Sequence, residues 1–180
     1  LYTRTIEDLT RELAKIKETP RFILHIHGAT SGDRFEYSAQ ALQKWELVLA
    51  KLQKRKLLLI AIVDGPLCDL SLSLALACDM RLGTAEVSLP KPSSDMPLPL
   101  WWLASLALHV GALRAQQLLW RRRAIDATEL QACGVLNHSP LGSSAAALSA
   151  EASSLPVPSS APLDLLRRIV LQGFSISGAD

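Results

Sequence analysis

Residues 57–79, LLLIAIVDGPLCDLSLSLALACD, contain the pattern that decides the fold. The run at 57–63 is apolar without interruption, which is typical of a strand covered on both faces in a parallel sheet. Gly65-Pro66 predicts a turn. The leucine-rich segment that follows predicts a buried helix, with the Asp69 carboxylate as its cap. This order of strand, turn and helix predicts an α/β domain with parallel strands.

The rest of the chain continues the alternation of helices and strands. Spacing and turn residues predict helices at 6–16, 41–53, 100–108, 113–120, 127–133 (capped by Asp126) and 163–173, with one weak helix inside 142–162. They predict a strand at 21–27 and two short strand pieces inside 80–90. No internal repeat divides the sequence, so we expect a single domain over residues 1–180.

Composition excludes several classes of function. Hydrophobic residues make up 49% and charged residues 20%, as in a globular domain, and a net charge of +2 does not favour nucleic acid. The basic runs at 51–56 and 121–123 are interpreted as solvated helix ends or loops, with an anionic ligand such as a nucleotide phosphate as the alternative. No apolar run reaches the roughly 20 residues of a membrane span. Three cysteines without a CxxC pair favour a reducing cytoplasm.

The histidines do not predict a metal site. His25 and His27 alternate along a strand and therefore share one face, but a metal ion needs further ligands and none stands at a suitable spacing. We therefore expect no metal and interpret both as packed side chains. His109 and His138 are expected at helix ends, in capping roles.

Two blocks of the sequence resemble the crotonase (enoyl-CoA hydratase/isomerase) superfamily. The first is LLLIAIVDGPL followed by LALACDMRL, and the second is HVGALRAQQLLWRRRAIDATELQACGVLN at 109–137. They stand in the family's order, and the resemblance covers about residues 6–137. It implies the family's repeated ββα spiral and an acyl-CoA thioester as the possible substrate, with no other cofactor.

The same resemblance assigns four candidate site residues. In the family, two backbone N–H groups hold the thioester oxygen as it becomes an enolate, and two glutamates move the protons. Leu70 stands at the central glycine that gives one N–H, and Ala39 stands loosely at the other donor. Ser73 and Lys91 occupy the positions of the two glutamates.

These replacements predict a degenerate active site. Both proton-transferring carboxylates are gone, the Leu70 side chain can crowd the pocket, and Asp69 would bring negative charge near a developing oxyanion. A Ser73–Lys91 catalytic pair is the alternative, since a lysine can activate a serine. A serine inside a helix, however, more often bonds to a carbonyl of its own helix.

Assembly is the second point at which the chain departs from the family. The sequence ends near the place where the family adds the C-terminal helices that build its trimer. Either these trimerisation helices are missing or the protein assembles differently. We expect a homo- or hetero-oligomer, with another crotonase or a polyketide synthase as the partner.

Three functions follow from the resemblance. QKWELVLAKLQKRKLLLIAIVDGP and LPLWWLASLALHVG resemble, more loosely, the auxiliary crotonase-like proteins of the dihydroxyphenylacetate/dihydroxyphenylglycine pathway. This favours an accessory or unconventional protein of a polyketide-type pathway that binds an acyl-CoA or acyl-carrier thioester. The alternatives are an active lyase or isomerase, hydratase- or decarboxylase-like, that relies on the oxyanion hole, and a purely structural partner subunit.

Overall fold

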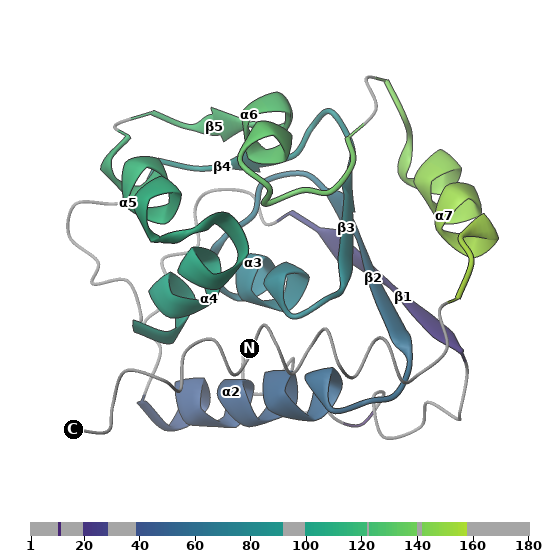
Figure 1. Cartoon of the computed structure of the whole chain (residues 1–180), viewed down its shortest axis with the longest axis horizontal. Coiled ribbons are helices and arrows are strands. Elements are labelled where there is room, and N and C mark those ends of the chain that lie inside the picture. The colour runs from purple at the N-terminus through teal and green to yellow at the C-terminus, as the bar shows by residue number, and fades with distance from the viewer. Residues whose placement is uncertain are drawn as a thin grey trace. The chain divides into compact units, whose positions relative to one another are not determined.

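The structure is a computed structural model that describes Arg11 and residues 20–28, 39–91, 100–121, 123–139 and 142–157. Its elements, labelled in Figure 1, are β1 (Arg21–His27), α2 (Ala39–Gln53), β2 (Leu58–Asp64), α3 (Asp69–Leu76), β3 (Met80–Gly83), β4 (Ser88–Leu89), α4 (Leu100–Val110), α5 (Ala112–Trp120), β5 (Ile125–Asp126), α6 (Ala127–Ala132) and α7 (Ala145–Ser154).

The described residues fall into two compact units. Unit 1 contains Arg11 and residues 20–22, 39–58 and 157, and unit 2 contains residues 23–28, 59–91, 100–121, 123–139 and 142–156. Each unit is described by itself. The expected single domain over residues 1–180 therefore stays a prediction.

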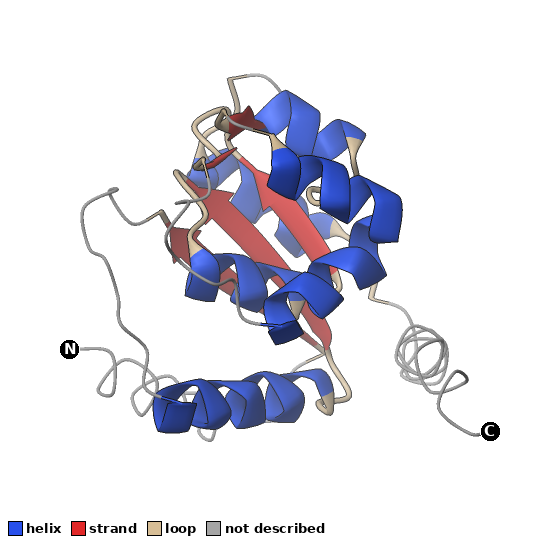
Figure 2. Ribbon diagram, turned by 90° about the vertical axis from the view of Figure 1, so that its left-hand side faces the viewer, coloured by secondary structure: helices blue, strands red, loops and turns tan. Residues whose placement is uncertain are grey.

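The central strand of the main sheet is β2, in the order β1–β2–β3. β2 and β3 run parallel, with Ile60 opposite Met80 and Val63 opposite Gly83. Every residue of β2 except Asp64 is buried. Figure 1 shows α3 and α7 on opposite sides of β3, and Figure 2 shows the strands of unit 2 between helices. The parallel, covered strand predicted from residues 57–63 is thus confirmed.

A second, two-stranded sheet pairs β4 with β5. The strands are antiparallel, with Ser88 opposite Asp126. The carboxylate of Asp126 also starts α6, because its Oδ1 accepts a hydrogen bond from the Glu129 N–H at 2.9 Å. The predicted strand pieces and the predicted Asp126 cap are both confirmed.

Strands, helices and connecting segments of unit 2 together supply its apolar core. α3 packs against α4 and α4 against α5. Gly111, with φ +86°, lets the chain turn between α4 and α5 in a conformation that other residues rarely adopt. The largest fully buried side chains of this unit are Leu59, Ile60, Ile62, Leu67, Leu72, Leu76, Leu82, Leu106, Ile125, Leu130 and Leu136. The predicted helices of this region are confirmed, with ends shifted by one or two residues.

In unit 1, α2 confirms the amphipathic helix predicted at 41–53 and begins two residues earlier, at Ala39. Trp45, Val48 and Leu52 are buried and share one face of the helix. No helix in the described residues is long and apolar enough to cross a membrane. α7 confirms the weak helix predicted inside 142–162, whereas the helices predicted at 6–16 (Arg11 apart) and 163–173 lie outside the described residues.

Candidate functional site

The turn between β2 and α3 is held from two sides. The Gly28 N–H at the end of β1 donates to the Asp64 carbonyl at 2.6 Å, and Leu67 N–H donates to the Ser88 carbonyl of β4 at 2.7 Å. Pro66 forms a parallel bridge to the same Ser88. Gly65 adopts φ +97°, which suits glycine. The first turn of α3 therefore has a fixed position between β1 and β4.

The start of α3 corrects one prediction. The helix begins at Asp69, so Asp69 is its first residue and Cys68 is the N-cap. The Cys68 N–H donates to Ser71 Oγ at 2.8 Å, and the Ser71 hydroxyl returns a bond to the Cys68 carbonyl at 2.9 Å. The cap comes from Ser71 inside the helix because the cysteine at the cap position is a weak hydrogen-bonding residue. The Asp69 side chain is outside the described part of the structure.

Leu70 keeps the backbone donor that the family resemblance assigns to it. It is the second residue of α3, where an α-helix leaves its N–H groups without an intrahelical acceptor. Within the described chain, no residue accepts a hydrogen bond from this N–H. The Leu70 side chain is buried, with 9% of its surface exposed. The N–H can therefore still meet a carbonyl oxygen, while the side chain takes up space that a glycine would leave open.

Ser73 is buried, whereas Lys91 is exposed. Ser73 is 1% exposed, and its hydroxyl donates to the Leu70 carbonyl at 2.7 Å. This is the bond within its own helix that the sequence favoured. Lys91 is exposed, two residues after β4. No hydrogen bond between the two side chains is found in residues 39–91, so a catalytic Ser73–Lys91 pair stays a prediction.

Ala39 is the first residue of α2 and belongs to unit 1, whereas Leu70 belongs to unit 2. The pairing of the two proposed oxyanion donors therefore stays a prediction.

Arg81 is the buried charge that sequence reasoning did not single out. It is 5% exposed, and its guanidinium donates to the carbonyls of Val135 at 2.6 Å and Cys78 at 2.8 Å. Its backbone N–H donates to Asn137 Oδ1 at 2.7 Å. The Asp79 carboxylate accepts from Leu59 N–H at 2.8 Å. Arg81 of ACDMR and the GVLN segment thus connect β3 to the chain after α6, and Asp79 of ACDMR connects the end of α3 to β2. These motif residues therefore have structural roles.

His25 and His27 are both exposed, so the prediction that they are packed side chains is wrong. His25 Nε2 lies 3.1 Å from Ser149 Oγ, and His27 Nδ1 lies 3.8 Å from Asp64 Oδ2. The described residues contain no group of three or more side chains that could hold a metal ion. The prediction that His138 lies at a helix end is wrong. His138 forms a parallel bridge to Leu82, so its backbone continues the sheet edge beside β3.

His109 does lie in the last turn of a helix, as predicted. Its Nδ1 is 2.8 Å from the Ser105 carbonyl, which can only accept, so Nδ1 carries the proton. The pKa of His109 is lowered, mainly because the ring is buried. The hydrogen bond to Ser105 acts in the opposite direction, and the nearby Arg81 charge also lowers the pKa. The neutral ring is therefore the form that the fold prefers.

We expect this histidine to weaken the fold in acid. Because the pKa is lower in the folded than in the unfolded chain, the unfolded state binds more protons as the pH falls through 6.5. The His109 contribution is complete above pH 6.5 and is lost as the pH falls towards the folded pKa. Urea unfolding from pH 7.5 to 5 should show a shallower slope for His109→Gln than for the wild type. A His25→Gln variant is the matched control, and equal slopes for wild type and His109→Gln would contradict the prediction.

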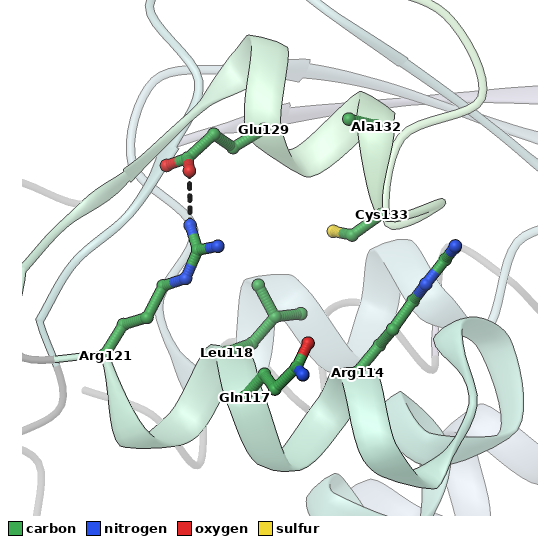
Figure 3. Close-up of a pocket in the computed structure, with 7 residues that line it drawn as sticks. All are labelled: Arg114, Gln117, Leu118, Arg121, Glu129, Ala132 and Cys133. Carbon is green, nitrogen blue, oxygen red and sulfur yellow. Dashed lines mark hydrogen bonds and ion pairs between the residues drawn. The ribbon is translucent and has the colours of Figure 1, made fainter.

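A hollow of about 230 Å³ lies between α5 and α6, and none of the four candidate residues lines it (Figure 3). It is lined by Arg114, Gln117, Leu118, Arg121, Glu129, Ala132 and Cys133. Arg121 and Arg123 both pair with Glu129, and the two guanidinium groups lower the pKa of that carboxyl. Before the structure, only the basic run at 121–123 pointed to this region.

Comparison with known proteins gives the family context. No protein-family model matches the chain. The enoyl-CoA isomerase/hydratase fer4 of Mycosarcoma maydis is 29% identical over 145 residues, which are 77% of this chain and 53% of the relative. The chain thus spans about half the length of the curated relative that it matches.

Solved structures share the fold at lower identity. An enoyl-CoA hydratase/carnithine racemase from Magnetospirillum magneticum has a TM-score of 0.74 at 20% identity, covering 94% of this chain and 72% of that one. A putative enoyl-CoA hydratase from Thermobifida fusca, in complex with CoA, has a TM-score of 0.69 at 22% identity, covering 98% and 76%. A monofunctional enoyl-CoA isomerase from M. smegmatis has a TM-score of 0.67 at 20% identity, covering 97% and 80%. The resemblance seen in the sequence is confirmed: the chain has the fold of the crotonase (enoyl-CoA hydratase/isomerase) superfamily.

Proposed function

We propose that the chain binds an acyl thioester, of CoA or of a carrier protein, at the first turn of α3 and does not hydrate it by a two-glutamate mechanism. The observation that carries this proposal is the Leu70 N–H, which has no acceptor among the described residues at the strand–turn–helix junction. A donor fixed in this way favours charge that develops on a thioester oxygen. The sequence likeness to an enoyl-CoA isomerase/hydratase supports the same class of ligand.

The missing proton transfer supports an accessory or unconventional role. Ser73 is buried and bonded to its own helix, and Lys91 replaces the second glutamate position with an exposed cation. Neither side chain is a carboxylate that could take a proton from the α-carbon and return it. In a polyketide-type pathway, such a protein would hold an acyl-CoA or acyl-carrier thioester for a partner enzyme.

One observation favours a second candidate, a lyase that uses the Leu70 N–H together with Lys91. β4 contacts the turn before α3 through Ser88, and Lys91 follows three residues later. Lys91 would bind the carboxylate of a malonyl-type thioester before that group leaves as CO2, and Leu70 N–H would stabilise the resulting enolate until it takes a proton from water. A purely structural subunit is the third candidate, and it requires no binding at all.

Leu70 variants test the donor directly. Leu70→Ala and Leu70→Pro both remove the leucine side chain, but only proline removes the backbone N–H. We expect calorimetric titration with acetyl-, malonyl- and crotonyl-CoA to show binding that free CoA does not reproduce. Leu70→Ala should bind at least as tightly as wild type, because space is opened. Leu70→Pro should bind about tenfold more weakly, the effect of roughly one lost hydrogen bond.

The remaining outcomes separate the candidates. Turnover of malonyl-CoA that Lys91→Ala abolishes, and that Lys51→Ala on α2 does not, would select the lyase. Equal binding by Leu70→Ala and Leu70→Pro, both folded by circular dichroism, would contradict the role of the N–H. Absence of binding to every acyl-CoA and to an acylated carrier protein would leave the structural subunit.

A further inference from the structure

Two large apolar side chains are exposed on one face of α5. Leu113 is 69% exposed and Trp120 is 72% exposed. They are seven residues apart, nearly two helical turns, so they share a face and lie about 10 Å apart along the axis. Leu47 on α2, at 59%, is the other large hydrophobic residue that is exposed in the described chain. Leu113 and Trp120 together are called the α5 ridge below.

A row of arginines borders the α5 ridge. Arg114 and Arg121 are also seven residues apart, and Figure 3 shows both extending from α5 towards α6 at the two ends of the hollow. Glu129 pairs with Arg121 and, at 2.7 Å, with Arg123. Arg114 has no partner in the part of the chain that the structure describes. Glu129 pairs with two of the three guanidinium groups and Asp126 also acts on Arg123, so the three arginines keep a net positive charge.

We propose that the α5 ridge and this arginine row form a docking surface for an acidic amphipathic helix of a partner protein. The apolar row and the basic row both repeat every seven residues, the interval at which a partner helix brings side chains back to one face. Leucines of such a helix would cover Leu113 and Trp120, and its carboxylates would meet Arg114 and the Arg121–Arg123 end. A free phosphate would meet an arginine but would leave the ridge exposed.

The hollow between α5 and α6 suits the same partner. Its floor contains the apolar groups of Leu118 and Ala132, beside the polar Gln117. At about 230 Å³ it is smaller than most small-molecule sites and can take one side chain of the partner. Exposed tryptophan and arginine beside a small pocket are the residue types that dominate binding energies in protein interfaces. If the proposed function is correct, the partner is an acyl carrier protein. Only this choice of partner rests on the proposed function, and the docking surface does not.

A designed peptide tests the surface without knowledge of the natural partner. The probe is a fluorescent peptide of about 18 residues that forms a helix with leucine and glutamate rows, each repeating every seven residues. The control peptide has lysine in place of glutamate. We expect the acidic peptide alone to bind, with an affinity that falls as salt is added. Trp120→Ala and Arg114→Glu should each weaken binding about tenfold or more.

Matched variants on α2 show whether the effect is local. Leu47→Ala removes another exposed apolar side chain, and Lys51→Glu reverses another exposed charge, so both should bind the peptide as wild type does. The same five proteins, wild type included, and an Arg121→Glu variant are then titrated with a holo acyl carrier protein of a polyketide synthase. Trp120→Ala, Arg114→Glu and Arg121→Glu should each weaken this binding while they keep acyl-CoA binding.

Several results would overturn the docking surface. One is equal binding of the acidic and the lysine peptide, and another is an unchanged peptide affinity in Trp120→Ala and Arg114→Glu. A third is self-association of the chain that Trp120→Ala abolishes, because a second copy would then be the occupant of the surface. Peptide binding without binding of any acyl-CoA or any acylated carrier protein would support the surface and contradict the thioester function. The two proposals can therefore fail independently.

Discussion

Replacing Arg81 by methionine should destabilise the fold by about 3 kcal/mol, although methionine fills much of the same volume. The Arg81 guanidinium is buried and donates to the carbonyls of Val135 and Cys78. Methionine has no donor, so both carbonyls would remain buried without these bonds. The connection between β3 and the segment after α6 would then depend on the backbone bonds of Arg81 and Asn137.

Urea unfolding followed by circular dichroism measures this loss. Arg114→Met is the matched control, because Arg114 is exposed on α5 and its replacement should change the free energy of unfolding by less than about 0.5 kcal/mol. Asn137→Ala removes the acceptor of the Arg81 N–H, and its effect should not add to that of Arg81→Met because both act on one network. A midpoint for Arg81→Met equal to that of Arg114→Met would show that the network contributes no net stability.

Much of this fold could be predicted from residues 57–79, because strand, turn and helix each have their own pattern there. The apolar run predicted β2, and Gly65-Pro66 predicted the turn after it. Elsewhere in the chain, the prediction that Asp126 caps α6 was also correct. Local patterns suffice where a single residue type has one strong preference. The cap of α3 was assigned one residue too late. The capping bond joins the Cys68 N–H to the Ser71 hydroxyl, and this bond forms only once the helix has brought Ser71 close to Cys68.

The candidate site was less predictable for a different reason. Alignment to a family places Leu70, Ser73 and Lys91, but it does not say whether a hydroxyl turns outwards or back to its own helix. The structure shows Ser73 bonded to the Leu70 carbonyl. Arg81 was missed because a single arginine in a motif does not reveal whether its side chain is buried. One of its acceptors, Cys78, is only three residues away, but the other, Val135, is more than fifty residues away and no local pattern indicates it.

Among the glycines that the structure describes, Gly28 should be the one at which alanine is most damaging. A Cβ atom at Gly28 would lie 2.2 Å from the Pro66 nitrogen and 2.5 Å from the Gly65 carbonyl carbon, both backbone atoms that no rotamer change can move. Either the end of β1 or the turn before α3 must shift. Ordinary overpacking costs about 1–3 kcal/mol, and we expect this change to exceed the upper end because rigid backbone is on both sides.

The same displacement should affect the candidate site, because the Gly65-Pro66 turn fixes the first turn of α3. We expect Gly28→Ala, at temperatures where it stays folded, to bind acyl-CoA more weakly than wild type by calorimetry. Gly142→Ala is the control: Gly142 has φ +77° but nothing within 4 Å of a new Cβ, so it should cost only about 1 kcal/mol of backbone strain and leave binding unchanged. Equal stability of the two variants would mean that the contact between β1 and the turn yields easily. A turn that yields so easily could not hold the Leu70 N–H in place for a thioester oxygen.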